Sequence, residues 1–248
     1  MNHTEILDGI KGCLDEHIEF CNGLGLYVAT VCKDRDPSHG YEHMKQVAKI
    51  SLLIFNQMHD NIKLSTMSIP SFITYILAVS WLHDVADRKY DHEGTLKLQL
   101  NNFITEIFGQ DKSKFILDTI ARTSYSNEIN MLQQFGKLDW DTELGNDGVI
   151  LRNIVSDADK LEAIGYEGVV RCMTYNIELL KKIGNLYPSF DELIIPVKKH
   201  TSEKLIKLAP SYIRTEYGKE LAKPKHDEMI NIFNDNEKLQ EIYSMIIK

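Results

Sequence analysis

Apolar residues recur every three to four positions along most of the chain, which is the spacing of helices with one buried face. A clear example is 41–58, where His43 shares an apolar face with Val47 and Ile54. No alternating polar and apolar run is long enough to indicate a β-sheet, so the pattern predicts an all-α protein. Other helices are expected over 4–32 with a bend near Gly23–Gly25, from Ser68 to about Asp84, over 94–108 and 111–125, from about Ser156 to beyond Tyr175, and over 199–209, 211–222 and 225–247.

Loops are predicted where polar and turn-forming residues gather, at 33–40, 59–68 and 139–148. Proline inside a helix removes a backbone hydrogen bond, so the late prolines are expected at helix breaks. These are Pro196, Pro210 and Pro224. The chain has no internal repeat, low-complexity segment or Gly/Ser linker, which favours a single domain over 1–248.

The composition is that of an ordinary globular chain, with 248 residues, 43% hydrophobic and 26% charged. Asp and Glu number 36 against 28 Lys and Arg, a formal charge of -8 that argues against a nucleic-acid-binding surface. The chain lacks a run of 18 apolar residues, so no membrane span is expected. Four cysteines without a CxxC pair indicate reduced thiols. Acidic residues in the first helical segment argue against a signal peptide, so the protein is predicted to be cytoplasmic.

Three His-Asp pairs are candidates for metal ligands, at 59–60, 83–84 and 226–227. The first and last lie in polar stretches and are interpreted as solvated surface residues. His83 and Asp84 instead follow the apolar run 76–82, and a polar pair at the end of a buried helix needs partners. Taken alone, that pair fits a hydrogen-bonded core histidine beside a helix-end carboxylate as well as it fits a ligand pair.

His43 strengthens the metal interpretation because it is also expected to point inward. Two inward histidines and an adjacent carboxylate from separate helices suit a divalent ion, and residues 156–162 offer a further carboxylate. A competing interpretation of Ser156 and Asp159 is a capping box at a helix start. The residues alone therefore leave open both a metal site and packed core histidines.

The order of these residues resembles the HD-domain superfamily of metal-dependent phosphohydrolases, in particular its small single-domain bacterial-type members. Residues 36–47 resemble the family box DxSHDxxHxxRV, 81–90 the box LLHDxxDxKY, 120–126 the segment IxxISFS and 154–165 the box IVxDADRLDAIG, while 200–208 and 214–216 are similar to its HFYEKLLKL and NTE segments. The resemblance covers about 30–235. Gln46 stands where the family has Arg, Gly40 where it has Asp, and Lys160 where it has Arg.

The resemblance implies a helical HD-domain bundle with one divalent metal ion, which could be Mn, Mg, Fe, Co or Ni. The implied metal ligands are His43, His83, Asp84 and Asp159. Asp157 would be a helix cap or a hydrogen-bond acceptor behind the ligands. His92 is the one histidine between Asp84 and Asp159, and since dinuclear relatives need more histidines there, a mononuclear hydrolase is favoured over a di-iron oxygenase.

The expected catalytic residues are His39, Asp84 and Lys160. His39 would donate a proton or order the attacking water, the alternative being a purely structural histidine. Lys160 would meet a phosphate, or else be a solvated lysine in a first helical turn. The segment 88–90 (Arg88, Lys89 and Tyr90) would line the phosphate entrance or form an exposed loop.

The implied function is hydrolysis of a phosphorylated small molecule, a nucleotide or a related phosphoester, by a metal-activated water. The alternative is a regulatory HD protein that binds a nucleotide or metal without turnover. A protein that serves only as an interaction scaffold is disfavoured, because the whole ordered set of motifs would then have to be accidental.

Overall fold

A computed structural model describes residues 3–36 and 38–247. Every regular element within them is a helix, which confirms the all-α prediction. The α-helices are α1 (Thr4–Leu7), α2 (Asp15–Val31), α3 (Tyr41–Met58), α4 (Ile69–Leu82), α5 (Thr95–Phe108), α6 (Gln110–Ile120), α7 (Tyr125–Phe135), α8 (Asp141–Glu162), α9 (Gly165–Lys182), α10 (Phe190–His200), α11 (Ile206–Tyr212), α12 (Glu216–Phe233) and α13 (Asn236–Ile246), with a 3₁₀ turn at His59–Asn61 and a π turn at Thr201–Leu205. Pro37, in the predicted loop 33–40, lies outside the described residues.

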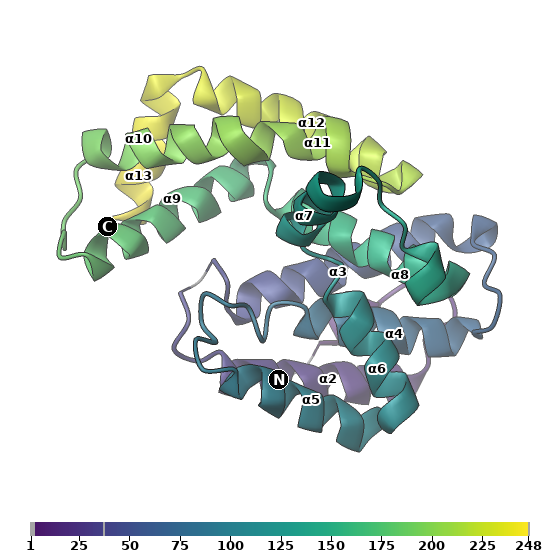
Figure 1. Ribbon diagram of the computed structural model, residues 1–248. Coiled ribbons are helices and arrows are strands. Elements are labelled where there is room, and N and C mark those ends of the chain that lie inside the picture. Colours follow the sequence, from purple (N-terminus) through teal and green to yellow (C-terminus); the bar gives the residue numbers. More distant parts are fainter. Residues whose placement is uncertain (1–2, 37, 248) are drawn as a thin grey trace.

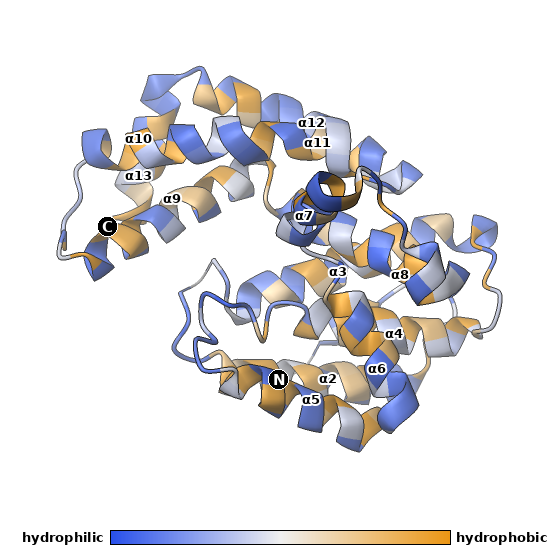
Figure 2. Ribbon diagram, viewed as in Figure 1, coloured by the Kyte–Doolittle hydropathy of each residue, from blue (hydrophilic) through white to orange (hydrophobic). Residues whose placement is uncertain are grey.

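Helices α3 and α8 pack against each other in the middle of the bundle (Figure 1). On one side of them lie α2, α4, α5 and α6, and on the other α9 to α13. Hydropathy colouring shows the apolar faces of these helices turned towards one another (Figure 2). The site described below lies where the two sides meet, so residues far apart in the sequence contribute to it.

Helix α4 is the most apolar helix, and its residues from Tyr75 to Leu82 are all buried. As predicted, Ser68 caps its start, where the hydroxyl accepts a hydrogen bond from the backbone N–H of Ser71. Since the helix ends at Leu82, His83 and Asp84 are the first polar residues beyond the core. Throughout 3–36 and 38–247, no helix combines the length and the apolar character needed to cross a membrane.

The predicted single helix over 4–32 is wrong. The chain turns between α1 and α2 at Gly9 and Gly12, both with positive φ, a backbone conformation that glycine adopts readily. The expected bend at Gly23–Gly25 is also wrong, since α2 runs through both residues. Gly25 instead makes room for the ring of His3, which a Cβ at that position would strike.

The predicted loop over 139–148 is wrong from Asp141 onwards, where α8 begins, and so is the expected helix start near Ser156. Gly145 (φ 64°) makes a kink early in α8. The nearby Asp147 carboxylate is buried and accepts hydrogen bonds from the backbone of 65–67. Ser156 lies in the middle of α8 and donates to the carbonyl of Thr123, so the capping-box interpretation is wrong as well.

The helix expected over 111–125 ends at Ile120, and an unpredicted helix, α7, begins after Ser124. The late prolines also lie elsewhere than expected, because Pro196, Pro210 and Pro224 are inside α10, α11 and α12. Buried residues in each of these helices hold them against the bundle, and such packing outweighs a lost backbone hydrogen bond. The single-domain boundaries stay a prediction.

Candidate metal centre

Three elements bring the predicted ligands together: His43 from α3, His83 and Asp84 from the end of α4, and Asp159 from α8. The His43 ring is buried. Its Nε2 lies 3.6 Å from Asp84 Oδ2 and 3.6 Å from Asp159 Oδ1. One edge of this imidazole therefore faces both carboxylates.

The His83 ring has its tautomer set by the backbone. Its Nδ1 donates a hydrogen bond of 2.8 Å to the carbonyl of Ser80, which can only accept, so in the neutral ring the lone pair is on Nε2. That Nε2 lies 3.9 Å from Asp84 Oδ1 and 3.9 Å from Asp159 Oδ1. The Nε2 atoms of His43 and His83 are both buried without a hydrogen-bond partner in the described part of the chain.

The two carboxylates are held in their ionised form. Burial raises the pKa of Asp84, but the neighbouring His83 and His43 outweigh it and bring the pKa well below its usual range. The same histidines lower the pKa of Asp159 against burial and the charge of Asp84. Donor atoms of His43, His83 and Asp84 lie within 4.8 Å of one another. Two unpartnered imidazole nitrogens beside two carboxylates fit a divalent cation, so these residues could hold a metal ion.

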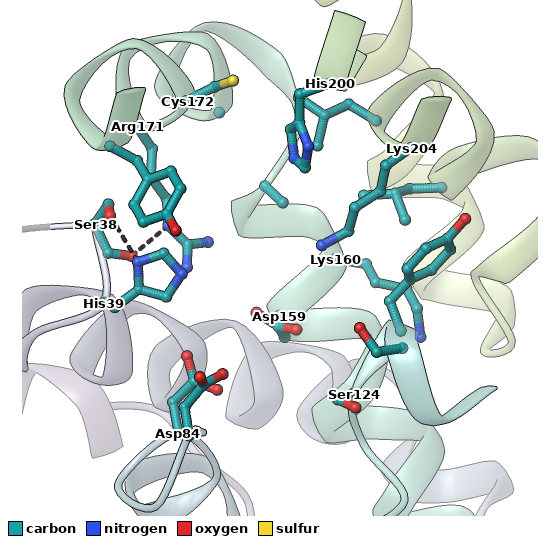
Figure 3. A pocket seen from close by; sticks show the side chains of 18 of the residues that line it. Ser38, His39, Asp84, Ser124, Asp159, Lys160, Arg171, Cys172, His200 and Lys204 are labelled. Atoms are coloured by element: carbon teal, nitrogen blue, oxygen red, sulfur yellow. Dashed lines mark hydrogen bonds between the residues drawn. The ribbon is translucent and has the colours of Figure 1, made fainter. Parts of the chain in front are cut away.

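A cavity opens above Asp84 and Asp159 (Figure 3). Its volume is about 180 Å³, more than ten times the roughly 10–15 Å³ that one water molecule needs. Basic and histidine side chains form much of its wall: His39, Arg88, Lys89, Lys160, Arg171, His200 and Lys204. Arg88 and Lys89 are exposed and line this cavity, and their role at a phosphate entrance stays a prediction. Tyr90 is directed elsewhere, since its hydroxyl donates to Asp36.

His39 is held between two polar neighbours at the wall of this cavity. Its Nδ1 lies 2.7 Å from Ser38 Oγ, and its Nε2 lies 3.1 Å from Lys89 Nζ. Burial lowers the pKa of His39, and the charges of Lys89 and Arg171 lower it further against the hydrogen bonding of Asp36. The ring is therefore neutral near pH 7.

Lys160 is buried and forms an ion pair of 2.9 Å with Glu128 of α7. Arg152 and Arg214 contact the same carboxylate, at 3.2 Å and 2.5 Å. These cations outweigh burial and lower the pKa of Glu128 to about 2. The interpretation of Lys160 as a solvated lysine is wrong. Its contact with phosphate stays a prediction, which this pairing with Glu128 weakens.

Asp157 does not lie behind the metal ligands. Its carboxylate accepts hydrogen bonds from the backbone N–H groups of Arg214 and Thr215 and from the Thr215 hydroxyl. It therefore fixes the start of α12 against α8. His92 is exposed and lies outside the His43, His83 and Asp84 group.

Three residues at the site had no role in the sequence interpretation: Glu162, Arg171 and Lys204. Glu162 follows Asp159 by three positions on α8, a spacing that places both on one helix face and could have indicated it. Arg171 comes from α9 and has no local pattern that points to it, whereas Lys204, in the π turn, lies within the segment 200–208 that resembles the family. Figure 3 shows the Lys204 amine directed into the cavity above Asp159.

Comparisons with known proteins show the fold. No protein-family model matches the chain, and no curated protein matches it either. Among solved structures, YpgQ from Bacillus subtilis in complex with ADP aligns with a TM-score of 0.59 and 19% identity, over 90% of this chain and 95% of YpgQ. A Lactobacillus plantarum protein aligns with a TM-score of 0.62 and 19% identity, over 87% of this chain and 94% of its own.

A protein from Bacillus thuringiensis, described as an HD-superfamily hydrolase, aligns with a TM-score of 0.57 and 21% identity. The alignment covers 91% of this chain and 98% of that protein. At such identities the likeness carries the fold and not the activity. The chain has the helical fold of HD-superfamily proteins.

Proposed function

We propose that the protein is a metal-dependent phosphohydrolase that acts on a nucleotide or a related phosphoester. One observation carries the proposal: His43 and His83 converge on Asp84 and Asp159, and these two carboxylates form the floor of a cavity whose wall is basic. An acidic floor that can hold a divalent cation and a basic wall that can hold an anion together suit a phosphorylated substrate.

The proposed ligands are the Nε2 atoms of both histidines and one oxygen from each of Asp84 and Asp159. A divalent ion there would polarise a phosphoryl oxygen and lower the pKa of a bound water. The hydrogen bond from His83 Nδ1 to Ser80 keeps the Nε2 lone pair available for binding. The buried position of His43 fixes its ring.

The basic wall would bind and orient the phosphate groups. Lys204 is directed towards Asp159, and burial together with the charges of Lys89 and Arg171 lowers the pKa of Lys204. Several cations in one partly buried cavity repel one another until an anion enters. Charge developing on the phosphoryl oxygens would then be stabilised by side chains that are already in place.

His39 would act as a hydrogen-bond acceptor towards water. A lysine ammonium has only donors, so its contact with Nε2 makes that atom the acceptor and leaves the proton on Nδ1. If the Lys89 amine turned to a phosphate of the substrate, the Nε2 lone pair would be free to order the attacking water or take its proton. His39 would therefore act first on the attacking water, as a hydrogen-bond acceptor or base, and not as the donor of a proton to the leaving group.

The nucleotide part of the proposal draws support from the complex of YpgQ with ADP, a protein of the same fold. Besides its basic wall, the cavity has aromatic and small residues, including Tyr125, Tyr175 and Gly168, against which a base or sugar could pack. The identity of the base and the bond cleaved are left to the assay.

Release of phosphate and pyrophosphate from a panel of nucleotides, with Mn²⁺, Mg²⁺, Co²⁺ or Ni²⁺ added, tests the proposal. The wild-type protein should hydrolyse at least one nucleotide when metal is present, and Asp84→Ala should not. A wild type that binds metal and nucleotide but releases no product would contradict hydrolysis and support a regulatory role instead.

A further inference from the structure

Glu162 lies on the side of His43 that faces away from the proposed metal ligands. The carboxylates of Asp84 and Asp159 approach Nε2 of the His43 ring, whereas Glu162 Oε2 lies 3.2 Å from Nδ1. The two nitrogens are on different edges of the imidazole. Glu162 therefore cannot bind the ion that Nε2 and the other proposed ligands would hold. Its carboxylate contacts Nδ1, the ring nitrogen of His43 that the proposed ligand set does not use.

Arg171 holds the Glu162 carboxylate in that position. Its Nη1 forms an ion pair with the same oxygen that faces His43, and its Nε donates a hydrogen bond of 2.6 Å to the carbonyl of Ser38. The side chains of Glu162 and Arg171 are both largely buried, with 15% and 16% exposed. A carboxylate anchored from one side by a buried guanidinium has little freedom to leave the histidine.

We propose that Glu162 is a positioning residue of the metal centre, which accepts the Nδ1 proton of His43 and so presents the Nε2 lone pair to the metal. The inference rests on the proposed function. Without an acceptor at Nδ1, a neutral imidazole can place its proton on either nitrogen, and protonation of Nε2 blocks metal binding. His83 has its tautomer set by the Ser80 carbonyl, and Glu162 does the same for His43.

The orientation of the His43–Glu162 contact is consistent with this role. The distance is that of a hydrogen bond, but Nδ1 is not yet aligned with the carboxylate in the described structure. The Glu162 carboxylate lies within hydrogen-bonding distance of Nδ1, and hydrogen bonds around a site commonly tighten when the site is filled. A carboxylate that orients a metal-binding histidine also increases the basicity of the nitrogen that binds the metal.

Binding of Mn²⁺ alone, measured by titration calorimetry on metal-stripped protein, tests the proposal without any substrate. Glu162→Gln keeps the volume but loses the charge, and Glu162→Ala removes the acceptor. We expect Mn²⁺ affinity to fall about 10-fold in Glu162→Gln and about 10- to 100-fold in Glu162→Ala. Glu167→Gln is the matched control, because Glu167 is exposed and pairs with Lys225. That control should bind Mn²⁺ like the wild type.

A spectroscopic measurement separates positioning from simple structural support. In protein with ¹⁵N-labelled histidine, long-range proton–nitrogen spectra show which ring nitrogen carries the proton, and the His43 signals are identified by their loss in His43→Gln. Burial and the charge of Arg171 lower the pKa of His43, but hydrogen bonding to Asp84 and Glu162 outweighs them and raises it, so the spectra are recorded at a pH where the ring is neutral. Metal-free wild type should then have His43 protonated at Nδ1, and Glu162→Leu, which has no acceptor, should show an increased share of the Nε2–H tautomer. Glu162→Leu decides the case if Glu162→Ala does not fold, because a glutamine oxygen could still accept the Nδ1 proton.

The two proposals fail in different ways. Unchanged Mn²⁺ affinity and an unchanged His43 tautomer in a folded Glu162→Ala or Glu162→Leu would overturn the role of Glu162, while hydrolysis by the wild type would still stand. A wild type that binds no divalent metal would overturn the proposed function and, with it, this inference.

Discussion

Lys89 Nζ lies 3.1 Å from Nε2 of His39, while Ser38 Oγ lies 2.7 Å from the other ring nitrogen. Because the lysine can only donate, His39 has a neutral ring with its lone pair directed towards the cavity wall. The Ser38 hydroxyl in turn donates to Asp36. His39, which was expected to donate a proton or to order the attacking water, is thus arranged as an acceptor.

This arrangement predicts the pH dependence of hydrolysis. The pKa of His39 is lowered below its ordinary 6.5, chiefly by burial. The neutral form is the active one, so activity should be full above pH 6.5 and fall as the pH drops through the pKa of His39. His39→Gln should lower kcat about 100-fold or more and flatten that acidic limb. A loss of activity on raising the pH through the pKa of His39 would mean that the protonated ring is required.

Lys204 is predicted to contribute to substrate binding. Removal of one charge-assisted hydrogen bond costs about 1.5–3 kcal/mol, so kcat/KM for Lys204→Ala should fall about 10- to 150-fold. Lys207→Ala provides the control, since Lys207 lies on the neighbouring helix α11 and is exposed. Steady-state kinetics with the best nucleotide of the panel would show the difference. Equal kcat/KM values for the two variants would remove Lys204 from the site.

The buried Glu128 is predicted to be a main determinant of stability. Its replacement by Gln leaves Lys160, Arg152 and Arg214 without their anionic partner, which should lower the free energy of unfolding by about 3–5 kcal/mol. Urea unfolding at pH 7 measures this loss, with Glu106→Gln, an exposed site, as the control.

The same carboxylate predicts acid sensitivity. The pKa of Glu128 is lowered from 4.5 to about 2 in the folded protein. Its stabilising contribution is therefore complete above pH 4.5 and is lost as the pH falls towards 2. The difference in the free energy of unfolding between wild type and Glu128→Gln should therefore become smaller as the pH falls from 4.5 towards 2. A difference in the free energy of unfolding that stays constant from pH 7 to pH 3 would contradict a stabilising role of the ionised Glu128 carboxylate.

Much of the site was predictable from the sequence because its residues lie at ends or on faces of apolar helices. Val47 and Ile54 identify the inward face of α3, and with it His43. The apolar run of α4 places His83 and Asp84 at the end of the core. Asp159 needed the resemblance to a family, since its neighbourhood also fits a helix start.

The remaining features depend on contacts between distant segments. Residues 141–148 have the composition of a loop, yet Asp147 is buried as the acceptor for the backbone of 65–67, which local sequence does not reveal. The same holds for Lys160, whose partner Glu128 lies on a helix that was not predicted. Arg171 reaches both Glu162 and the Ser38 carbonyl across the bundle, and periodicity carries no information on such contacts.

The most direct test follows metal binding and hydrolysis together in one metal-stripped sample. As Mn²⁺ is added, hydrolysis should rise from zero in proportion to the ion bound and reach its maximum at one ion per chain. Asp159→Asn should bind Mn²⁺ weakly and stay inactive, whereas Asp141→Asn, at an exposed position of the same helix, should behave like the wild type. Full hydrolysis by the stripped protein or by Asp159→Asn would contradict the account.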